Sequence, residues 1–188
     1  MKITSLSIGI TALLLVTVVD GFAAPGTDPG PDRPGAWSNV SFGKGEDPHA
    51  SGIEIEMWRK GGQLFGFLSE YNGPASDPPA GKLESIRWDE TSGAISFTAK
   101  LSVGVTPAAA GSAWVPSKNL YEFNGTIEKK GITGTLRRSF VNDDGSSTAY
   151  DESVTLAPKR ADGATAGESF EDWTKRWNEA LKTRGPKW

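Results

Sequence analysis

Two residues of opposite charge in the last third of the chain, Arg138 and Glu152, are the first candidates for a chemical site. Both lie in segments where apolar and polar residues alternate, and an odd-length turn at residues 143–147 pairs these segments as strands. The expected register sets Arg138 opposite Glu152 on the apolar face. Because a buried charge is costly unless it is paired, the two side chains either orient a polar group of a ligand or form a structural ion pair at the rim.

Glu54 and Glu56 lie two residues apart on another predicted strand and share a face. Two neighbouring carboxylates serve as acid and base in glycoside cleavage, so an enzyme is one hypothesis. Alternating glutamates are also the ordinary solvent side of a strand. Asp143, Asp144 and Gly145 resemble part of a calcium loop, but the alternate ligand spacing and the distal glutamate are missing. We therefore expect a simple turn there, with no metal.

The histidine and cysteine content, the glycine motifs and the net charge argue against several classes of function. His49, in a loop with glycine and proline, is the single histidine, so a histidine zinc site or a Ser-His-Asp triad has almost nothing to use. The chain has no cysteine, so thiol catalysis is impossible. No glycine-rich phosphate motif stands at a strand-to-helix junction. The formal net charge is −3 and there is no basic cluster, which disfavours nucleic acid as a partner. No cofactor is expected.

Four β-hairpins are predicted in succession, over residues 53–71, 83–103, 121–136 and 134–156. Gly61-Gly62 suits the first turn and sets Ile55 opposite Leu68. A two-residue turn at Lys130-Gly131 sets Phe123 opposite Arg138 in the third hairpin. The apolar faces of these strands carry six aromatic residues that are candidates to line a ligand cavity: Trp88, Phe97, Tyr121, Phe123, Phe140 and Tyr150.

The end of the chain predicts one amphipathic helix over residues 169–183. Ser169 is suited to cap it, and Gly185-Pro186 stops it. Its apolar stripe includes Phe170, Trp173 and Trp177. The first hairpin carries an aromatic face of its own, formed by Trp58, Phe65 and Phe67. This face is either covered by the helix or left open as a docking surface for a partner.

The start of the chain is typical of an exported protein. Lys2 precedes an apolar run from Ile8 to Val19, the length of a secretory signal and shorter than the roughly 20 residues of a membrane span. We expect a signal peptide over residues 1–23 and a flexible leader rich in proline and glycine over 24–35. An exported chain without cysteine suits a bacterial periplasm or exterior.

The spacing of these elements predicts an all-β fold. About eight antiparallel strands form an up-and-down meander, and such a sheet loses its free edges when it closes into a small barrel. The barrel domain is expected over residues 36–157, a linker over 158–168, and the amphipathic helix after it. The interior of a barrel of this size is either filled by side chains or holds one small ligand.

Gly35-Ala36-Trp37 opens the first predicted strand, and Asn39 follows it. This start resembles the Gly-x-Trp motif of calycin barrels, which include the lipocalins and the avidins. In avidins the asparagine contacts the ureido group of biotin, so the resemblance implies a ligand site that includes Asn39. Residues 37–39 followed by 52–54 are also similar to uncharacterised exported bacterial proteins with the same meander pattern.

Three function classes follow from these observations. The first is an exported, non-enzymatic binding module that holds a small apolar or amphipathic ligand in a calycin-like barrel. The alternative is a protein-interaction module, such as an inhibitor, an immunity protein or an envelope-assembly factor, that acts through its long loops or its aromatic face. An enzyme is third. A cavity of about 300 Å³ or more lined by the six aromatic residues favours the first class, and a packed interior favours the second.

Overall fold

The computed structural model describes residues 32–44, 49–74, 76–108, 113–160 and 167–188. The predicted signal peptide and most of the predicted leader lie outside these ranges. Within them, no helix has the length and apolarity that crossing a membrane requires.

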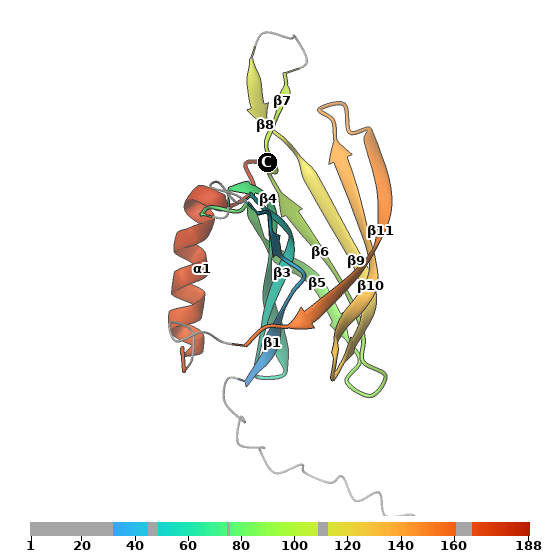
Figure 1. Ribbon diagram of the computed structural model, residues 1–188, viewed down its shortest axis with the longest axis vertical. Helices are drawn as coiled ribbons and strands as arrows, with labels where there is room; N and C mark the ends of the chain where they lie inside the picture. Colours follow the sequence, from blue (N-terminus) through green and yellow to red (C-terminus); the bar gives the residue numbers. More distant parts are fainter. Residues whose placement is uncertain (1–31, 45–48, 75, 109–112, 161–166) are drawn as a thin grey trace, which may run out of the picture.

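Eight antiparallel strands form a closed barrel, as predicted (Figure 1). Their order around the ring is β1-β11-β10-β9-β6-β5-β4-β3, and β3 pairs again with β1. The bounds are β1 Asp32–Ser38, β3 His49–Lys60, β4 Gln63–Pro74, β5 Ala80–Trp88, β6 Ala94–Leu101, β9 Asn119–Glu128, β10 Gly131–Val141 and β11 Ser147–Pro158. The short β2 (Ser41–Phe42) pairs with the start of β3. A separate hairpin of β7 (Val105–Pro107) and β8 (Trp114–Pro116) projects from one end.

The first strand begins earlier than predicted. β1 starts at Asp32, inside the segment expected to be a flexible leader, and pairs with β3 from Arg59 onwards. The pairing shifts between Asp32 and Gly35. β1 closes the barrel because it also pairs with the end of β11.

The register of the β3–β4 hairpin is the predicted one, with Ile55 opposite Leu68 and a turn at Gly61-Gly62. The predicted registers of the β9–β10 and β10–β11 hairpins are wrong by two residues. The β9–β10 turn is Lys129-Lys130, and Phe123 pairs with Leu136. A shift of two preserves which face each side chain occupies, so the core face was predicted correctly although the partners were not.

A pair of glycines explains this register. Gly125 and Gly134 lie directly opposite each other, and an added Cβ on either would stand only 2.6 Å from Cζ of Phe123. The backbone of both strands therefore makes room for the Phe123 ring. Such a close approach is a typical reason for glycine inside a strand.

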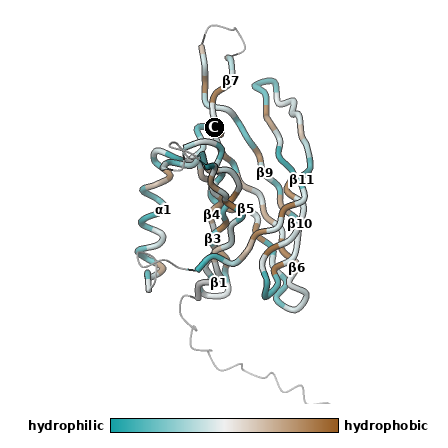
Figure 2. The backbone as a smooth tube through the Cα atoms, in the orientation of Figure 1, coloured by the Kyte–Doolittle hydropathy of each residue, from teal (hydrophilic) through white to brown (hydrophobic). Residues whose placement is uncertain are grey.

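The interior of the barrel is filled with apolar side chains. Along the barrel strands these alternate with hydrophilic residues (Figure 2). Phe97 and Phe123 stack at its centre with ring centroids 5.0 Å apart. The fully buried residues around them include Ile53, Ile55, Met57, Leu68, Leu101, Ile132, Leu136 and Leu156.

The helix α1 (Phe170–Arg184) packs on the outside of the barrel, over β3 and β4 (Figure 1). The Asp172 amide donates to the Ser169 hydroxyl at 3.1 Å, so the predicted cap is confirmed. Trp173 lies on Trp58 and Phe67, and Trp177 stacks on Phe67 at 4.5 Å. The aromatic face of the first hairpin is therefore covered by the helix.

Candidate functional site

Arg138 is held by two carboxylates at one end of the barrel interior. Its Nη1 lies 2.9 Å from Oε1 of Glu70, and its Nη2 lies 3.2 Å from Oε2 of Glu152. The Glu70 side chain is only 7% exposed, against 45% for Glu152. The Tyr121 hydroxyl also donates to Glu70. The expected pairing of Arg138 with Glu152 exists, but the more buried partner is Glu70.

Sequence reasoning missed Glu70, although a signal was present. The predicted register of the first hairpin sets Glu70 opposite Ile53, on the mostly aliphatic face that becomes the barrel interior. A carboxylate at such a position requires a buried cation or hydrogen-bond donors. The strand partner of Arg138 is Tyr150 rather than Glu152, so the ion pair with Glu152 runs diagonally between neighbouring strands.

The pKa values of Tyr121 and Arg138 are both shifted by burial and by the neighbouring Glu70 carboxylate. Burial and the nearby Glu70 carboxylate raise the pKa of the Tyr121 phenol well above its usual range. Burial alone would lower the pKa of the Arg138 guanidinium, but Glu70, Tyr121 and Glu152 raise it above its ordinary value. At neutral pH Tyr121 is therefore neutral and Arg138 is charged, and the ion pair of Arg138 with Glu70 offsets part of the cost of burying both charges.

The structure does not bring the six aromatic candidates together around one cavity. Phe97, Tyr121 and Phe123 are buried in the packed interior. Trp88 packs partly buried against the core from the end of β5. Phe140 and Tyr150 are each 48% exposed, so their expected interior position is wrong. Phe140 lies on β10 and Tyr150 on β11, where these two strands extend past the Arg138 cluster and beyond the buried core.

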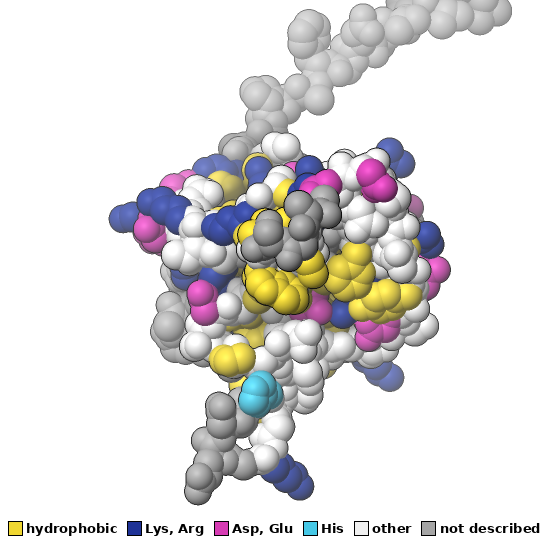
Figure 3. Space-filling view, turned by 90° about the horizontal axis from the view of Figure 1, so that it is seen from above, with side chains coloured by type: hydrophobic (Ala, Val, Ile, Leu, Met, Phe, Trp, Pro, Cys, Tyr) yellow, Lys and Arg dark blue, Asp and Glu magenta, His cyan; other side chains and the backbone are white. Residues whose placement is uncertain are grey.

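Large apolar side chains gather instead at the outer end of the barrel, beyond the Arg138 cluster. We call these the rim surface: Val105, Trp114, Val115, Phe140 and Tyr150. Trp114 is 70% exposed and Val105 is 60% exposed. Figure 3 views this end of the molecule from above and shows hydrophobic side chains next to charged ones. Residues 104–118 contain the β7–β8 hairpin, which carries three of these side chains.

A hollow of about 360 Å³ lies between the β7–β8 hairpin and the end of β10 with the turn that follows it. Pro107, Val115, Pro116 and Phe140 form its apolar walls. Its polar margin includes Lys118, Asp143 and Asp144. Lys118 forms an ion pair with Asp143. Asp144 accepts hydrogen bonds from Ser146, which lower the pKa of its carboxyl.

The β7–β8 hairpin is fixed at its base by buried hydrogen bonds. Oδ1 of Asn119 accepts from the Val103 amide at 2.9 Å and from the Ser117 hydroxyl at 2.6 Å. The Val141 amide donates to the Lys118 carbonyl at 2.9 Å, which links the hairpin base to β10. These hydrogen bonds tie the hairpin to β10 on the other side of the hollow.

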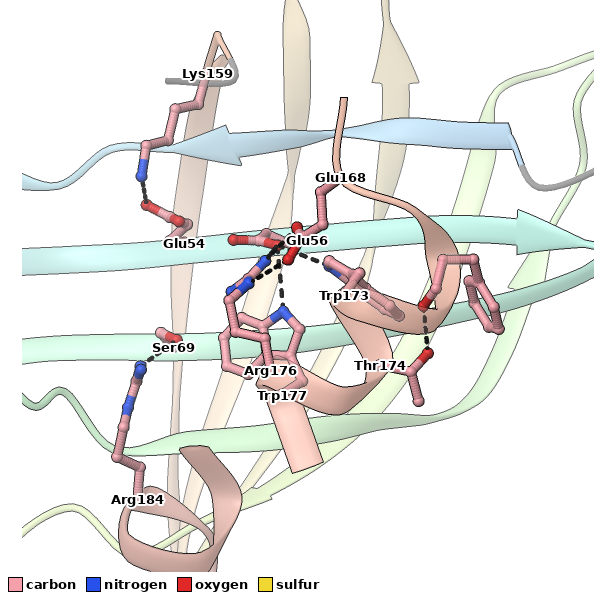
Figure 4. Close-up of polar contacts among 11 residues, drawn as sticks. Glu54, Glu56, Ser69, Lys159, Glu168, Trp173, Thr174, Arg176, Trp177 and Arg184 are labelled. Atoms are coloured by element: carbon pink, nitrogen blue, oxygen red, sulfur yellow. Dashed lines mark hydrogen bonds and ion pairs between the residues drawn. The ribbon is translucent and has the colours of Figure 1, made fainter. Parts of the chain in front are cut away.

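The two glutamates considered for catalysis have structural roles (Figure 4). Oε2 of Glu56 accepts from Nε1 of Trp173 at 2.8 Å, Nε1 of Trp177 at 3.2 Å and Nη2 of Arg176 at 3.0 Å. Burial would raise the pKa of Glu56, but Arg176 and these hydrogen bonds lower it below its ordinary value. Glu54 pairs with Lys159 at 2.7 Å. Both carboxylates serve contacts that hold the helix and the linker to the barrel.

The other candidate residues also have local roles. Oδ1 of Asn39 accepts from the Ile53 amide at 2.8 Å, so this asparagine, singled out by the avidin resemblance, bonds to the backbone of β3. Trp37 is buried in the core. The turn lies at residues 142–146, one residue earlier than predicted, and is closed by the Gly145 amide donating to the Asn142 carbonyl. The described residues contain no group of three potential metal ligands.

Comparisons with family models, with curated proteins and with solved structures find no match to this chain.

Proposed function

We propose that this protein is an exported protein-interaction module that binds its partner through the rim surface. One observation carries the proposal. Val115 and Phe140 are exposed and line a hollow of about 360 Å³, and Trp114 and Val105 are exposed on the same β7–β8 hairpin as Val115. The interior of the barrel and the aromatic face under the helix are both packed. Contiguous exposed apolar side chains on a folded domain are typical of interaction sites.

The form of the rim surface suits a protein partner. An exposed tryptophan on a two-stranded hairpin supplies a large contact area at a small cost in side-chain entropy, and tryptophan is enriched among residues that dominate binding energy. The hollow next to it accepts a side chain from the partner, with Pro107, Val115 and Phe140 as apolar walls. The charged Lys118, Asp143 and Asp144 at its margin provide the polar rim that such interfaces have.

A ligand on the barrel axis is less well supported. Phe97 and Phe123, the residues expected to line a central cavity, stack on each other at 5.0 Å inside the packed core. The charged cluster of Glu70, Arg138 and Tyr121 occupies the interior at the rim end. A small ligand would have to displace these contacts before it reached the axis.

Export rests on the apolar run from Ile8 to Val19 and on the small residues before Ala24. N-terminal sequencing of the protein recovered from its own host tests this part of the proposal separately. The expected mature chain begins at Ala24. Recovery of the chain with Met1 still in place would contradict export.

Site-specific photo-crosslinking in the native host tests the interaction. The photoreactive amino acid p-benzoylphenylalanine replaces Val115 or Phe140 at the rim surface, and Phe42 in a control. Phe42 is a matched control because it is also exposed and apolar but lies outside the rim surface. We expect a discrete crosslinked complex from both rim positions, its loss in a Trp114→Ser background, and none from the control. Equal crosslinking at all three positions, or none at the rim, would contradict the proposal.

A further inference from the structure

The β7–β8 hairpin at the rim surface is a poor template for an added strand. β7 and β8 form a two-stranded sheet of their own, and each contains a proline, Pro107 in β7 and Pro116 in β8. A proline has no amide hydrogen to donate to a neighbouring strand, and prolines blunt sheet edges for this reason. Recognition at this end of the barrel therefore depends on side chains, and the hollow of about 360 Å³ beside the hairpin is the place where one can enter.

The polar side chains that line this hollow already use their hydrogen-bond donors within the chain. Four of the lining side chains carry a donor, and each one is bonded: Lys118 to Asp143, Asn142 to Ser146, Ser117 to Asn119 and Thr106 to the Pro107 carbonyl. A carboxylate or another acceptor of a partner would have to break one of these bonds to find a side-chain donor here. The hollow is therefore unsuited to an anionic group.

Asp144 offers the opposite kind of group at the margin of the hollow. Its carboxylate accepts from the amide and the hydroxyl of Ser146, and it pairs with no cation among the residues that the structure describes. Those hydrogen bonds hold the pKa of Asp144 below its ordinary value, so the group is charged at neutral pH. Since Lys118 and Asp143 neutralise each other, the lining keeps one unpaired negative charge, and charge complementarity favours a cationic occupant.

We propose that the hollow accepts an arginine side chain from a basic segment of the partner, an inference that rests on the proposed interaction through the rim surface. The methylene groups of the arginine lie against Val115 and Phe140, and its guanidinium pairs with Asp144. Arginine suits the site better than lysine because its planar guanidinium stacks on an aromatic ring and meets a carboxylate with two parallel donors. Phe140 supplies such a ring in the wall of the hollow, with 48% of the residue exposed.

A pair of small capped amino acids tests the occupant directly. N-acetylarginine methylamide is the probe, and N-acetylcitrulline methylamide is its matched control because citrulline has nearly the same shape and no charge. Each is titrated into the ¹⁵N-labelled full chain, and the amide chemical shifts of Val115, Val141 and Asp144 are followed. We expect saturable shifts with the arginine probe, and about 2- to 5-fold weaker binding of the citrulline probe, the range of one exposed ion pair.

Three variants separate the charge of the site from its apolar wall. Asp144→Asn keeps an acceptor for Ser146 and so keeps the turn; it should weaken the arginine probe about 2- to 5-fold and leave the citrulline probe unchanged. Phe140→Ala removes part of the wall and should weaken both probes. Glu128→Gln removes the same charge at the other end of β9, and this control should change neither affinity.

Three results would each overturn the assignment of arginine: no saturable shift with the arginine probe, equal affinity for the arginine and citrulline probes, or equal losses from Asp144→Asn and Glu128→Gln. The crosslinking from Val115 and Phe140 would still detect a partner of another chemistry, so these results leave the proposed interaction standing. Selective binding of the arginine probe without a crosslink at the rim would support the site and contradict the protein interaction instead.

Discussion

Arg138 and Glu70 form an ion pair at 2.9 Å although 68 residues separate them in the chain. Their strands, β10 and β4, are not neighbours. One path around the ring between them passes through β9, β6 and β5, and the other through β11, β1 and β3. The two side chains therefore meet across the middle of the barrel from opposite walls. With the Tyr121 hydroxyl on Glu70, they separate the apolar core from the rim surface.

The first prediction concerns the two carboxylates that hold Arg138. Glu70→Gln leaves the buried guanidinium with one exposed counter-ion, and should lower the free energy of unfolding by about 3 kcal/mol. Glu152→Gln removes the more exposed partner and should cost less than about 1 kcal/mol. Urea unfolding of both variants measures the difference. An equal cost for the two substitutions would show that Glu70 is not the main partner.

Tyr121 should resist ionisation in the folded protein. Its pKa is raised above the ordinary value of 10.0 by burial and by Glu70. The near-ultraviolet titration of Tyr121→Phe should therefore superimpose on that of the parent chain up to about pH 11. The folded pKa lies above the unfolded one, so this group's contribution to stability is present below pH 10 and is lost at higher pH. A smaller absorbance change in the variant below pH 11 would contradict this.

The Glu56 network should make helix docking sensitive to acid. The pKa of Glu56 is lower in the folded state than its ordinary 4.5, so its contribution to stability is present above that value and declines as the pH falls through the folded pKa. Glu56→Gln should be less stable than the parent chain at pH 7, and the gap should narrow below about pH 4.5. Denaturant unfolding of both chains over this range measures it. A gap that widens towards low pH would contradict the network.

Removal of the buried indole of Trp173 should weaken the packing of α1 on β3 and β4. This side chain packs on Trp58 and Phe67 and donates to Glu56. Trp173→Ala should cost about 3 to 5 kcal/mol of stability, as other large-to-small core substitutions do. Hydrogen exchange should become faster along α1 and along β3 and β4. Phe170→Ala, at a less buried position of the same stripe, is the control and should cost less.

The glycine pair under Phe123 should tolerate no side chain. An added Cβ on Gly134 would lie 2.4 Å from the Asn124 carbonyl oxygen and 2.6 Å from Phe123. Gly134→Ala should therefore destabilise the barrel by about 1 to 3 kcal/mol through overpacking. Gly43→Ala, where the nearest atom would be at an ordinary 3.5 Å, is the matched control. Thermal unfolding compares them, and similar midpoints for both variants would be evidence against the close approach.

Local signals made several elements predictable. The Gly61-Gly62 turn has a positive φ at both positions, a conformation that glycine favours, and so the register of β3 and β4 followed from the sequence. The Ser169 cap and the Gly185-Pro186 stop set the ends of α1 in the same way. Alternating hydrophobicity predicted the face of each strand and the closed barrel, because only one face of such a sheet is buried in the core.

Tertiary contacts decided the strand registers and the partner of Arg138, which the alternation of apolar and polar residues does not determine. Alternation is unchanged by a slip of two residues, so packing of Phe123 over Gly125 and Gly134 selected the register of β9 with β10. The sequence indicated that Arg138 and Glu152 would be close and point inwards. It could not show that Glu70 would reach Arg138 from the opposite wall, because that contact exists only once eight strands have closed into a ring.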